Sequence, residues 1–280
     1  MASGLSLHIG LNSVDPKHYA GWDGQLRACE QDAHDMAKLA TALGYTPTEM
    51  LTKAATAKSV IGALNKAAKS LVAGDTFFLT YSGHGGQVPD RNGDESKQDT
   101  DEVGEFPDQY DETWVLYDRQ LIDDELYQLW SAFAPKVRIV MLSDSCHSGT
   151  VAKPMAGALR SVDAPASRRM PLDVEDKTYR EHKRQYDAIQ KRTPPRAAAS
   201  IPGTVVLISG CQDNQTSADG RVNGRFTGRL LQVWGGGTFK GNLAKLCKVI
   251  VAGMPPDQTP NYYVVGASNR PFVRGQALKL

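Results

Sequence analysis

Short apolar runs alternate along the chain with stretches in which apolar residues recur every three or four positions. The apolar runs at 5–11, 75–82, 137–143, 204–209 and 262–265 predict strands. The periodic stretches at 29–43, 56–73, 122–133, 226–234 and 239–251 predict helices. Strands separated by helices are typical of an α/β fold with a mostly parallel sheet that is covered on both faces.

Two long segments interrupt this alternation. Residues 90–112 hold ten acidic and two basic residues and are predicted to form a long loop. Residues 160–196 hold ten basic and six acidic residues with four prolines, and we expect a linker that contains one helix, at 178–192. Long loops inside compact domains are usually functional or disordered.

Composition and charge exclude several classes of protein. The chain has 280 residues, 41% of them hydrophobic, and its 32 basic and 31 acidic residues give a net charge of +1. A disordered chain would have fewer apolar residues and a strong net charge. A nucleic-acid binder that acts through bulk charge would have an excess of basic residues. We find no apolar run long enough for a membrane helix, no signal peptide, no nucleotide-binding motif and no paired Cys-x-x-Cys. These absences predict a cytoplasmic protein with reduced thiols and no organic cofactor.

Reactive side chains follow two of the predicted strands. His84 lies in a glycine-rich segment after the strand at 75–82, and Cys146 follows the strand at 137–143. The carboxyl ends of parallel strands meet at one edge of a sheet, so a cysteine nucleophile and an assisting imidazole would lie together there. The backbone N–H groups of Gly85 and Cys146 are candidates for stabilising an oxyanion. The alternative is an inert buried thiol and a structural histidine.

Three motifs carry a resemblance to a known family. SGHGG at 82–86, DSCHSG at 144–149 and SGCQDNQTSAD at 209–219 resemble the metacaspases, which are caspase-like cysteine peptidases. The resemblance implies a caspase-like α/β/α sandwich with about six strands. Within that one domain it implies a large-subunit-like segment at 1–159, a basic linker at 160–200 and a small-subunit-like segment at 201–280. It also implies a monomer, and we expect no pro-domain before the first strand.

The resemblance further implies a cysteine endopeptidase that cleaves protein or peptide substrates after arginine or lysine. His84 would be the general base and Cys146 the nucleophile, while the family's acidic primary pocket matches Cys29, Asp32, Ser82 and Asp144. A carboxylate pair would hold a guanidinium by charge-assisted hydrogen bonds and would repel an aspartate side chain. The alternatives are a helix-surface acid at Asp32 and a turn former at Asp144. A caspase-like peptidase of other preference and a silent caspase-fold scaffold also stay open.

Calcium binding and self-processing are two further expectations. The family's calcium site matches Asp111, Asp123 and Asp124, but Lys153 stands where the family has an acid, which would weaken or abolish the site. We expect a peptidase with this preference to cut its own basic linker and thereby convert a zymogen into the active enzyme. The alternative is a linker that stays intact. The basic residues that we consider as cleavage sites are Arg160, Arg168, Arg169, Lys177, Arg180, Lys183 and Arg184.

Overall fold

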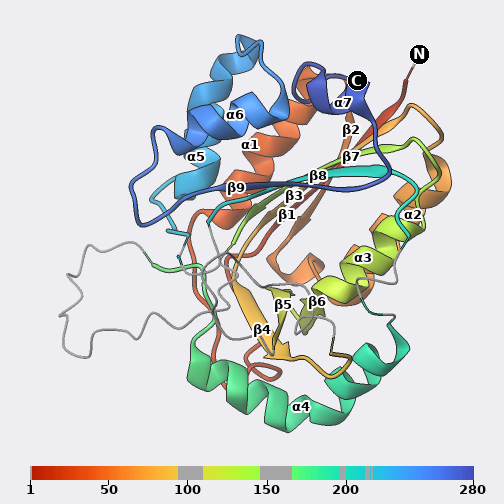
Figure 1. Cartoon of the computed structure of the whole chain (residues 1–280). Helices are drawn as coiled ribbons and strands as arrows, with labels where there is room; N and C mark the ends of the chain where they lie inside the picture. The colour runs from red at the N-terminus through yellow and green to blue at the C-terminus, as the bar shows by residue number, and fades with distance from the viewer. Residues whose placement is uncertain are drawn as a thin grey trace, which may run out of the picture.

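Six strands form the main sheet of the molecule, in the order β2-β1-β3-β7-β8-β9 (Figure 1). The computed structural model describes residues 2–93, 110–145, 166–193, 195, 200–211, 215 and 217–280. Five strands are parallel and the last is antiparallel to its neighbour. In chain order they are β1 (Gly4–Gly10), β2 (Thr46–Leu51), β3 (Thr76–Ser82), β7 (Arg138–Asp144), β8 (Thr204–Ser209) and β9 (Asn261–Gly266). The predicted mostly parallel sheet of about six strands is confirmed.

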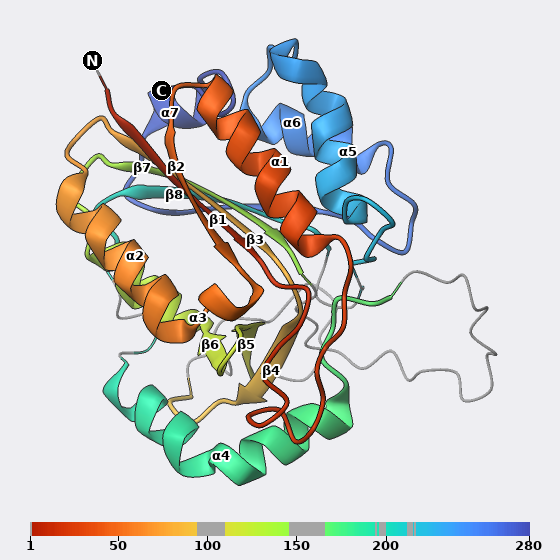
Figure 2. The same ribbon diagram turned by 180° about the vertical axis from the view of Figure 1, so that it is seen from behind.

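Helices cover both faces of this sheet, as Figures 1 and 2 show. Phe77 and Leu79 of β3 pack on one face, against α2 (Ala57–Ser70) and α3 (Asp123–Ser131), whereas Phe78 packs on the other. The helices of that second face are α1 (Cys29–Ala42), α5 (Arg225–Trp234), α6 (Leu243–Val251) and the short α7 (Arg270–Arg274). Because side chains alternate between two covered faces, every residue of β3 is buried.

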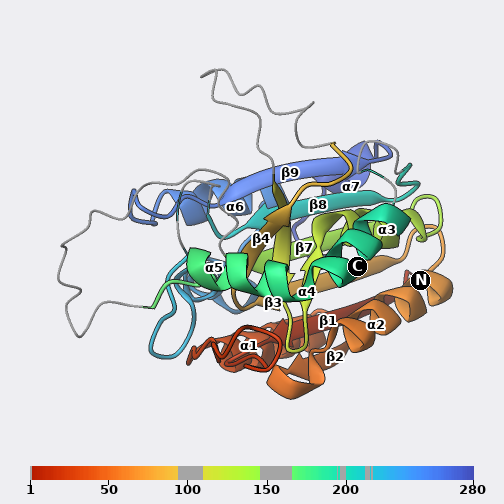
Figure 3. The ribbon, with the colours of Figure 1, turned by 90° about the horizontal axis from the view of Figure 1, so that it is seen from below.

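A second, antiparallel sheet lies beyond the carboxyl end of β3. It consists of β4 (Gly85–Pro89), β5 (Tyr110–Val115) and β6 (Gln120–Ile122). The helix α4 (Leu172–Arg192) crosses it, which is visible from below in Figure 3, and Tyr179, Tyr186 and Ile189 form an apolar cluster with β4 and β6. The Tyr186 hydroxyl lies 3.1 Å from the Gln120 backbone nitrogen, whose N–H donates to it, and 2.8 Å from Nε2 of His18. α4 is thereby fixed to the body of the domain.

Several predicted boundaries were wrong. We did not predict β2, β4, β6 or α7, and β5 begins at Tyr110, inside the segment predicted to be a loop. α6 begins at Leu243 rather than at 239, after a turn at Gly235–Gly237, and another short turn, Thr52–Ala54, follows β2. The helix of the linker begins six residues earlier than predicted, at Leu172, where Asp173 and Glu175 suit the positive end of its dipole.

Within the described part of the chain, no helix is both long enough and apolar enough to cross a membrane.

Candidate active site

The carboxyl ends of β3 and β7 bring two of the predicted pocket residues together. Ser82 and Asp144 end these strands and are direct register partners. Asp32 comes from the first turn of α1, and the Ser82 hydroxyl donates to its Oδ2 at 2.6 Å. This approach of α1 depends on Gly10 in β1, because a Cβ there would lie 2.2 Å from the Cys29 carbonyl oxygen. Cys29, Asp32, Ser82 and Asp144 are all buried at this corner.

An arginine of the linker occupies the space between these residues. The Arg168 side chain is fully buried, with Nη2 2.8 Å from Asp32 Oδ2 and Nη1 3.0 Å from Asp144 Oδ2. Nη1 also donates to Ser82 Oγ at 2.8 Å. A third carboxylate, Asp219, lies 2.9 Å from Nη2. We did not predict Asp219 as a pocket residue, although the acid that ends the motif at 209–219 was a signal for it.

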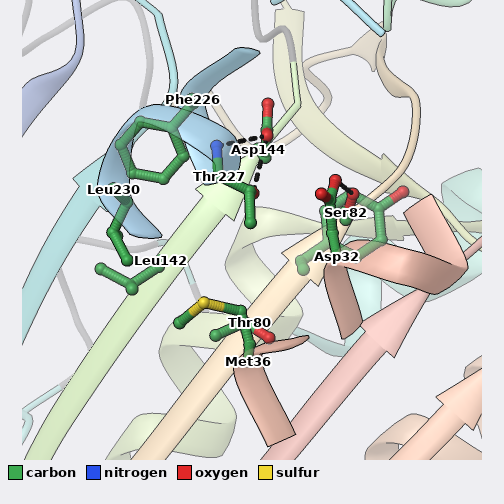
Figure 4. A pocket seen from close by; sticks show the side chains of 10 residues that line it. Asp32, Met36, Thr80, Ser82, Leu142, Asp144, Phe226, Thr227 and Leu230 are labelled. Atoms are coloured by element: carbon green, nitrogen blue, oxygen red, sulfur yellow. Dashed lines mark hydrogen bonds between the residues drawn. The ribbon is translucent and has the colours of Figure 1, made fainter. Parts of the chain in front are cut away.

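The segment after β8 holds the carboxylates in place. Asp144 Oδ2 accepts from the Thr227 backbone N–H at 3.0 Å and from its hydroxyl at 2.8 Å (Figure 4). Asp32 accepts from the Gly224 N–H and from the Asn223 side-chain amide, both at 3.0 Å. Between these carboxylates and the apolar residues Met36, Leu142, Phe226 and Leu230 lies a cavity of only about 10 Å³. That is space for about one water molecule, so the pocket ends at the carboxylates.

Gly224 forms one wall of the pocket. A Cβ at this position would lie 2.4 Å from Arg168 Nη1 and 2.5 Å from its Cζ. Cys29 lies on another side, and burial raises the pKa of its thiol to about 12. A thiol with that pKa stays protonated and unreactive near neutral pH, so Cys29 contributes shape and not chemistry.

Charge makes this pocket selective. Burial raises the pKa of Asp32 to about 6, against the opposing effect of the Arg168 charge. Burial alone would lower the pKa of Arg168, but the facing carboxylates outweigh it and raise that pKa well above its ordinary value. Removing one partner of a buried ion pair is strongly destabilising. Three carboxylates around one guanidinium therefore favour a cationic occupant and disfavour an anionic one.

The backbone around Arg168 runs as an extended strand through the site. Its N–H donates to the Ser217 carbonyl at 2.9 Å, and one step earlier the Asp219 N–H donates to the Ala166 carbonyl at 2.8 Å. The Arg168 carbonyl accepts from the Gly85 N–H at 3.0 Å. The sequence-predicted oxyanion donor Gly85 thus already holds a peptide carbonyl, that of the residue in the acidic pocket. Residues 167–170 are buried or partly buried against the domain, not solvated as a linker would be.

His84 lies beside this carbonyl, directly after β3. Its Nε2 donates to the Gly24 carbonyl at 3.0 Å, and its Nδ1 makes no hydrogen bond to the residues that the structure describes. Burial lowers the pKa of His84 to about 4, so the imidazole is neutral near pH 7. The Tyr81 hydroxyl donates to the His84 carbonyl at 2.7 Å and fixes the backbone here. The sequence did not predict the Gly24 carbonyl, since a backbone group carries no side-chain signal.

Several predicted residues lie outside the described part of the chain: Cys146, Lys153 and Arg160. The described chain reaches Ser145, whose hydroxyl lies 2.9 Å from that of Ser143. Four cleavage candidates, Lys177, Arg180, Lys183 and Arg184, lie on the exposed side of α4.

The residues predicted to bind calcium lie beside the small sheet. Asp111 is on β5, and Asp123 and Asp124 begin α3, where Asp124 accepts from the Asn92 side-chain amide at 2.6 Å. Across the described ranges, no group of three or more His, Cys, Asp or Glu side chains is arranged to hold a metal ion. These three residues alone therefore do not fit a calcium site, and calcium binding stays a prediction.

Comparisons with known proteins agree with this architecture. The family model described as "Caspase domain" matches residues 14–266. Metacaspase-1A of Aspergillus fumigatus is 28% identical and that of Aspergillus clavatus 30%, each over 80% of this chain but 58% and 56% of the relative. The chain thus spans a little more than half the length of these curated relatives.

Solved structures extend the comparison. The protein GSU0716 from Geobacter sulfurreducens is 49% identical, with a TM-score of 0.85 over 98% of this chain and 97% of that one. Caspase-1 from Spodoptera frugiperda is 10% identical, with a TM-score of 0.51 over 95% and 88% of the two chains, and this likeness concerns the fold alone. The family match across most of the chain means that it belongs to the caspase domain family, in which it is metacaspase-like.

Proposed function

We propose that this chain is a cysteine endopeptidase that cleaves peptide bonds after arginine and, less efficiently, after lysine. One observation carries the proposal. The Arg168 guanidinium is held by three carboxylates while its carbonyl accepts the Gly85 N–H beside His84. The Arg168 side chain is thus in the acidic pocket, and its carbonyl group lies beside the His84 imidazole. A substrate residue would need the same arrangement for its peptide bond to be cleaved.

In the proposed mechanism, Nδ1 of His84 takes the proton of the Cys146 thiol, and the resulting thiolate attacks the carbonyl carbon of the residue in the acidic pocket. The developing oxyanion is stabilised by the N–H groups of Gly85 and Cys146. His84 then gives a proton to the departing amine, and water hydrolyses the thioester with His84 as the base. Gly24 orients the imidazole through Nε2, which leaves Nδ1 for this proton transfer. Arginine is preferred because its planar fork bonds several acceptors at once, whereas lysine offers a single ammonium.

Self-processing is part of the proposal, and the bond is Arg168–Arg169. Four of the other candidate residues lie on α4, which would have to unwind before it could bind as an extended strand. Arg168 is instead already extended and buried in the acidic pocket. In the intact chain this segment fills the place of a substrate, so we expect a zymogen that becomes active towards other proteins after the cut.

The test uses fluorogenic peptide amides that end in Arg, Lys or Asp, with the full chain as the enzyme. We expect hydrolysis in the order Arg, Lys, Asp, with Asp at background, and a self-cleavage fragment whose first residue is Arg169. Cys146→Ala should remain uncut and inactive, whereas Cys247→Ala, which removes a buried thiol of α6, should behave like the unchanged chain. Failure of the folded chain to cleave any of these peptides would favour the scaffold alternative.

Calcium stimulation is proposed separately, and the same assay tests it. Rates are compared in millimolar calcium and in a chelator. Higher rates in calcium support a site completed by residues other than Asp111, Asp123 and Asp124. Equal rates remove calcium from the proposal and leave the peptidase intact.

A further inference from the structure

Met170 is fully buried in an apolar cluster two residues after Arg168. Its neighbours in that cluster are Val14, Tyr19 and Val115, with the partly buried Trp22 and Val174 packed against them. The Met170 N–H donates to the Gly85 carbonyl at 2.8 Å, and the Gly85 N–H donates to the Arg168 carbonyl at 3.0 Å. One residue of β4 therefore sets the register of the chain on both sides of the Arg168–Arg169 bond.

The side chains of this segment alternate as those of a strand do. Arg168 and Met170 point into the domain, whereas Arg169 is partly exposed. Nη2 of Arg169 lies 3.8 Å from Oε2 of Glu175 on α4. Any substrate held by the same Gly85 hydrogen bonds would present its own side chains in this order. The second residue after the cleaved bond would then enter the cavity that Met170 fills.

All walls of this cavity except Val174 belong to the body of the domain and not to the linker. The Val14 N–H donates to the Asp23 carbonyl, and the Trp22 N–H to the Tyr19 carbonyl, both at 2.9 Å. The Tyr19 hydroxyl donates to the Leu116 carbonyl at 2.6 Å. Only Val174 comes from α4, so the other walls would remain if the linker departed.

We propose that Val14, Tyr19, Trp22 and Val115 form a binding subsite for an apolar, unbranched side chain two residues beyond the cleaved bond. This inference rests on the proposed function and extends it: a substrate is recognised as arginine, any residue, then methionine or a similar side chain. Trp22 joins the subsite to the chemistry, since its ring packs edge-on against His84 with the ring centroids 4.7 Å apart.

The test compares internally quenched peptides based on residues 166–173, Ala-Ser-Arg-Arg-Met-Pro-Leu-Asp, cleaved by the self-processed full chain. Replacing the methionine by alanine should lower kcat/KM roughly 10- to 100-fold, because the substrate loses the free energy gained by burying an apolar side chain of that size. Replacing the leucine by alanine is the matched control, because Leu172 is 46% exposed and should matter little. Any competition from the enzyme's own Met170 affects all these peptides alike, so the ratios between them are preserved.

Two further measurements separate the possible failures. A coumarin amide of Ala-Ser-Arg has no residue at the second position beyond the bond, so it reports the proposed function alone. Its hydrolysis together with equal rates for the methionine and alanine peptides would overturn the subsite but not the peptidase. No hydrolysis of any substrate would overturn both. The isosteric variant Val14→Thr should lower the ratio of kcat/KM between the methionine and alanine peptides several-fold, and an unchanged ratio would count against the assignment.

Discussion

The single methyl group added by Gly224→Ala should abolish most of the arginine preference. The new Cβ would lie 2.4 Å from Nη1 and 2.5 Å from both Cζ and Nη2 of an arginine bound as Arg168 is. The backbone at Gly224 has φ −56° and ψ 153°, which alanine adopts without strain. The Gly224 N–H that holds Asp32 is also retained. The perturbation is therefore confined to the space for the guanidinium.

The magnitude follows from how far the guanidinium must retreat. An ordinary contact needs about 3.4 Å, so the group must move by about 1 Å. The Gly224 N–H is hydrogen-bonded to Asp32, so a guanidinium that moves away from Gly224 also moves away from Asp32. This lengthens the 2.8 Å hydrogen bond from Nη2 to Asp32 and disturbs the 2.8 Å hydrogen bond from Nη1 to Ser82. Hydrogen bonds to charged groups contribute about 1.5–3 kcal/mol each. The loss of two lowers kcat/KM for arginine peptides by about 10²- to 10⁴-fold.

Lysine peptides should lose less, because a flexible stem with a compact ammonium can shift without breaking a fixed fork. The assay is kcat/KM for matched Arg and Lys amides, and the expected result is a fall of about tenfold or more in the Arg/Lys ratio. Gly228→Ala is the control: this glycine lies on α5, and among the described residues outside its own helix the added Cβ would meet only Asn223, at 3.5 Å. An unchanged Arg/Lys ratio in folded Gly224→Ala would refute the assignment of the acidic pocket.

Four further outcomes are expected. The pKa of Asp32 is about 6 with Arg168 bound, and the Arg168 charge lowers it, so the pKa in the empty pocket is about 6 or above. As the pH is lowered, kcat/KM for arginine peptides should therefore begin to fall at about pH 6 or above. A fall that begins only near pH 4 would contradict this. Asp219→Asn should lower that kcat/KM about tenfold or more, and an effect below about twofold would remove Asp219 from the pocket. Iodoacetamide should label Cys146 of the processed chain but not the buried Cys29, and a Cys29 adduct in the mass spectrum would be contrary evidence. In the Cys146→Ala background, Arg168→Gln should lower the free energy of unfolding by roughly 3–5 kcal/mol and Arg168→Lys by less, as measured by denaturant titration; equal stabilities would argue against the ion cluster.

The parts of the site that depend on side-chain type and strand ends could be predicted from the sequence. A run of apolar residues that ends in Ser82, and another that ends directly before Asp144, give the positions of both strand termini to within one residue. Parallel pairing then brings these termini together, and the structure has them in direct register. Five of the six strands of the sheet followed from such apolar runs, whereas the number of about six came from the family resemblance. Its edge strand β2 was missed because most of its residues are exposed and show no apolar alternation.

The remaining parts depend on contacts that no local pattern encodes. The Gly24 carbonyl and the Gly85 N–H act through the backbone, and only the folded chain shows what they face. The acidic and basic composition of 160–196 predicted a linker with one helix, since neither Arg168 nor Met170 has periodic apolar neighbours. Burial of Arg168 becomes favourable only when carboxylates from α1, the end of β7 and the segment after β8 converge on it. These three groups come from distant parts of the sequence.

The same convergence explains why the linker is held in the site. Desolvating three carboxylates without a counter-charge is costly, and the raised pKa of Asp32 is a direct sign of that cost. A pocket built to select a cationic side chain is therefore least stable when it is empty. By supplying Arg168 from its own linker, the chain stabilises the pocket, and under the proposed function the same segment would keep other substrates out. In the proposed self-processing, cutting the Arg168–Arg169 bond would remove the covalent tether on one side of this side chain, so that an arginine of another protein would take its place.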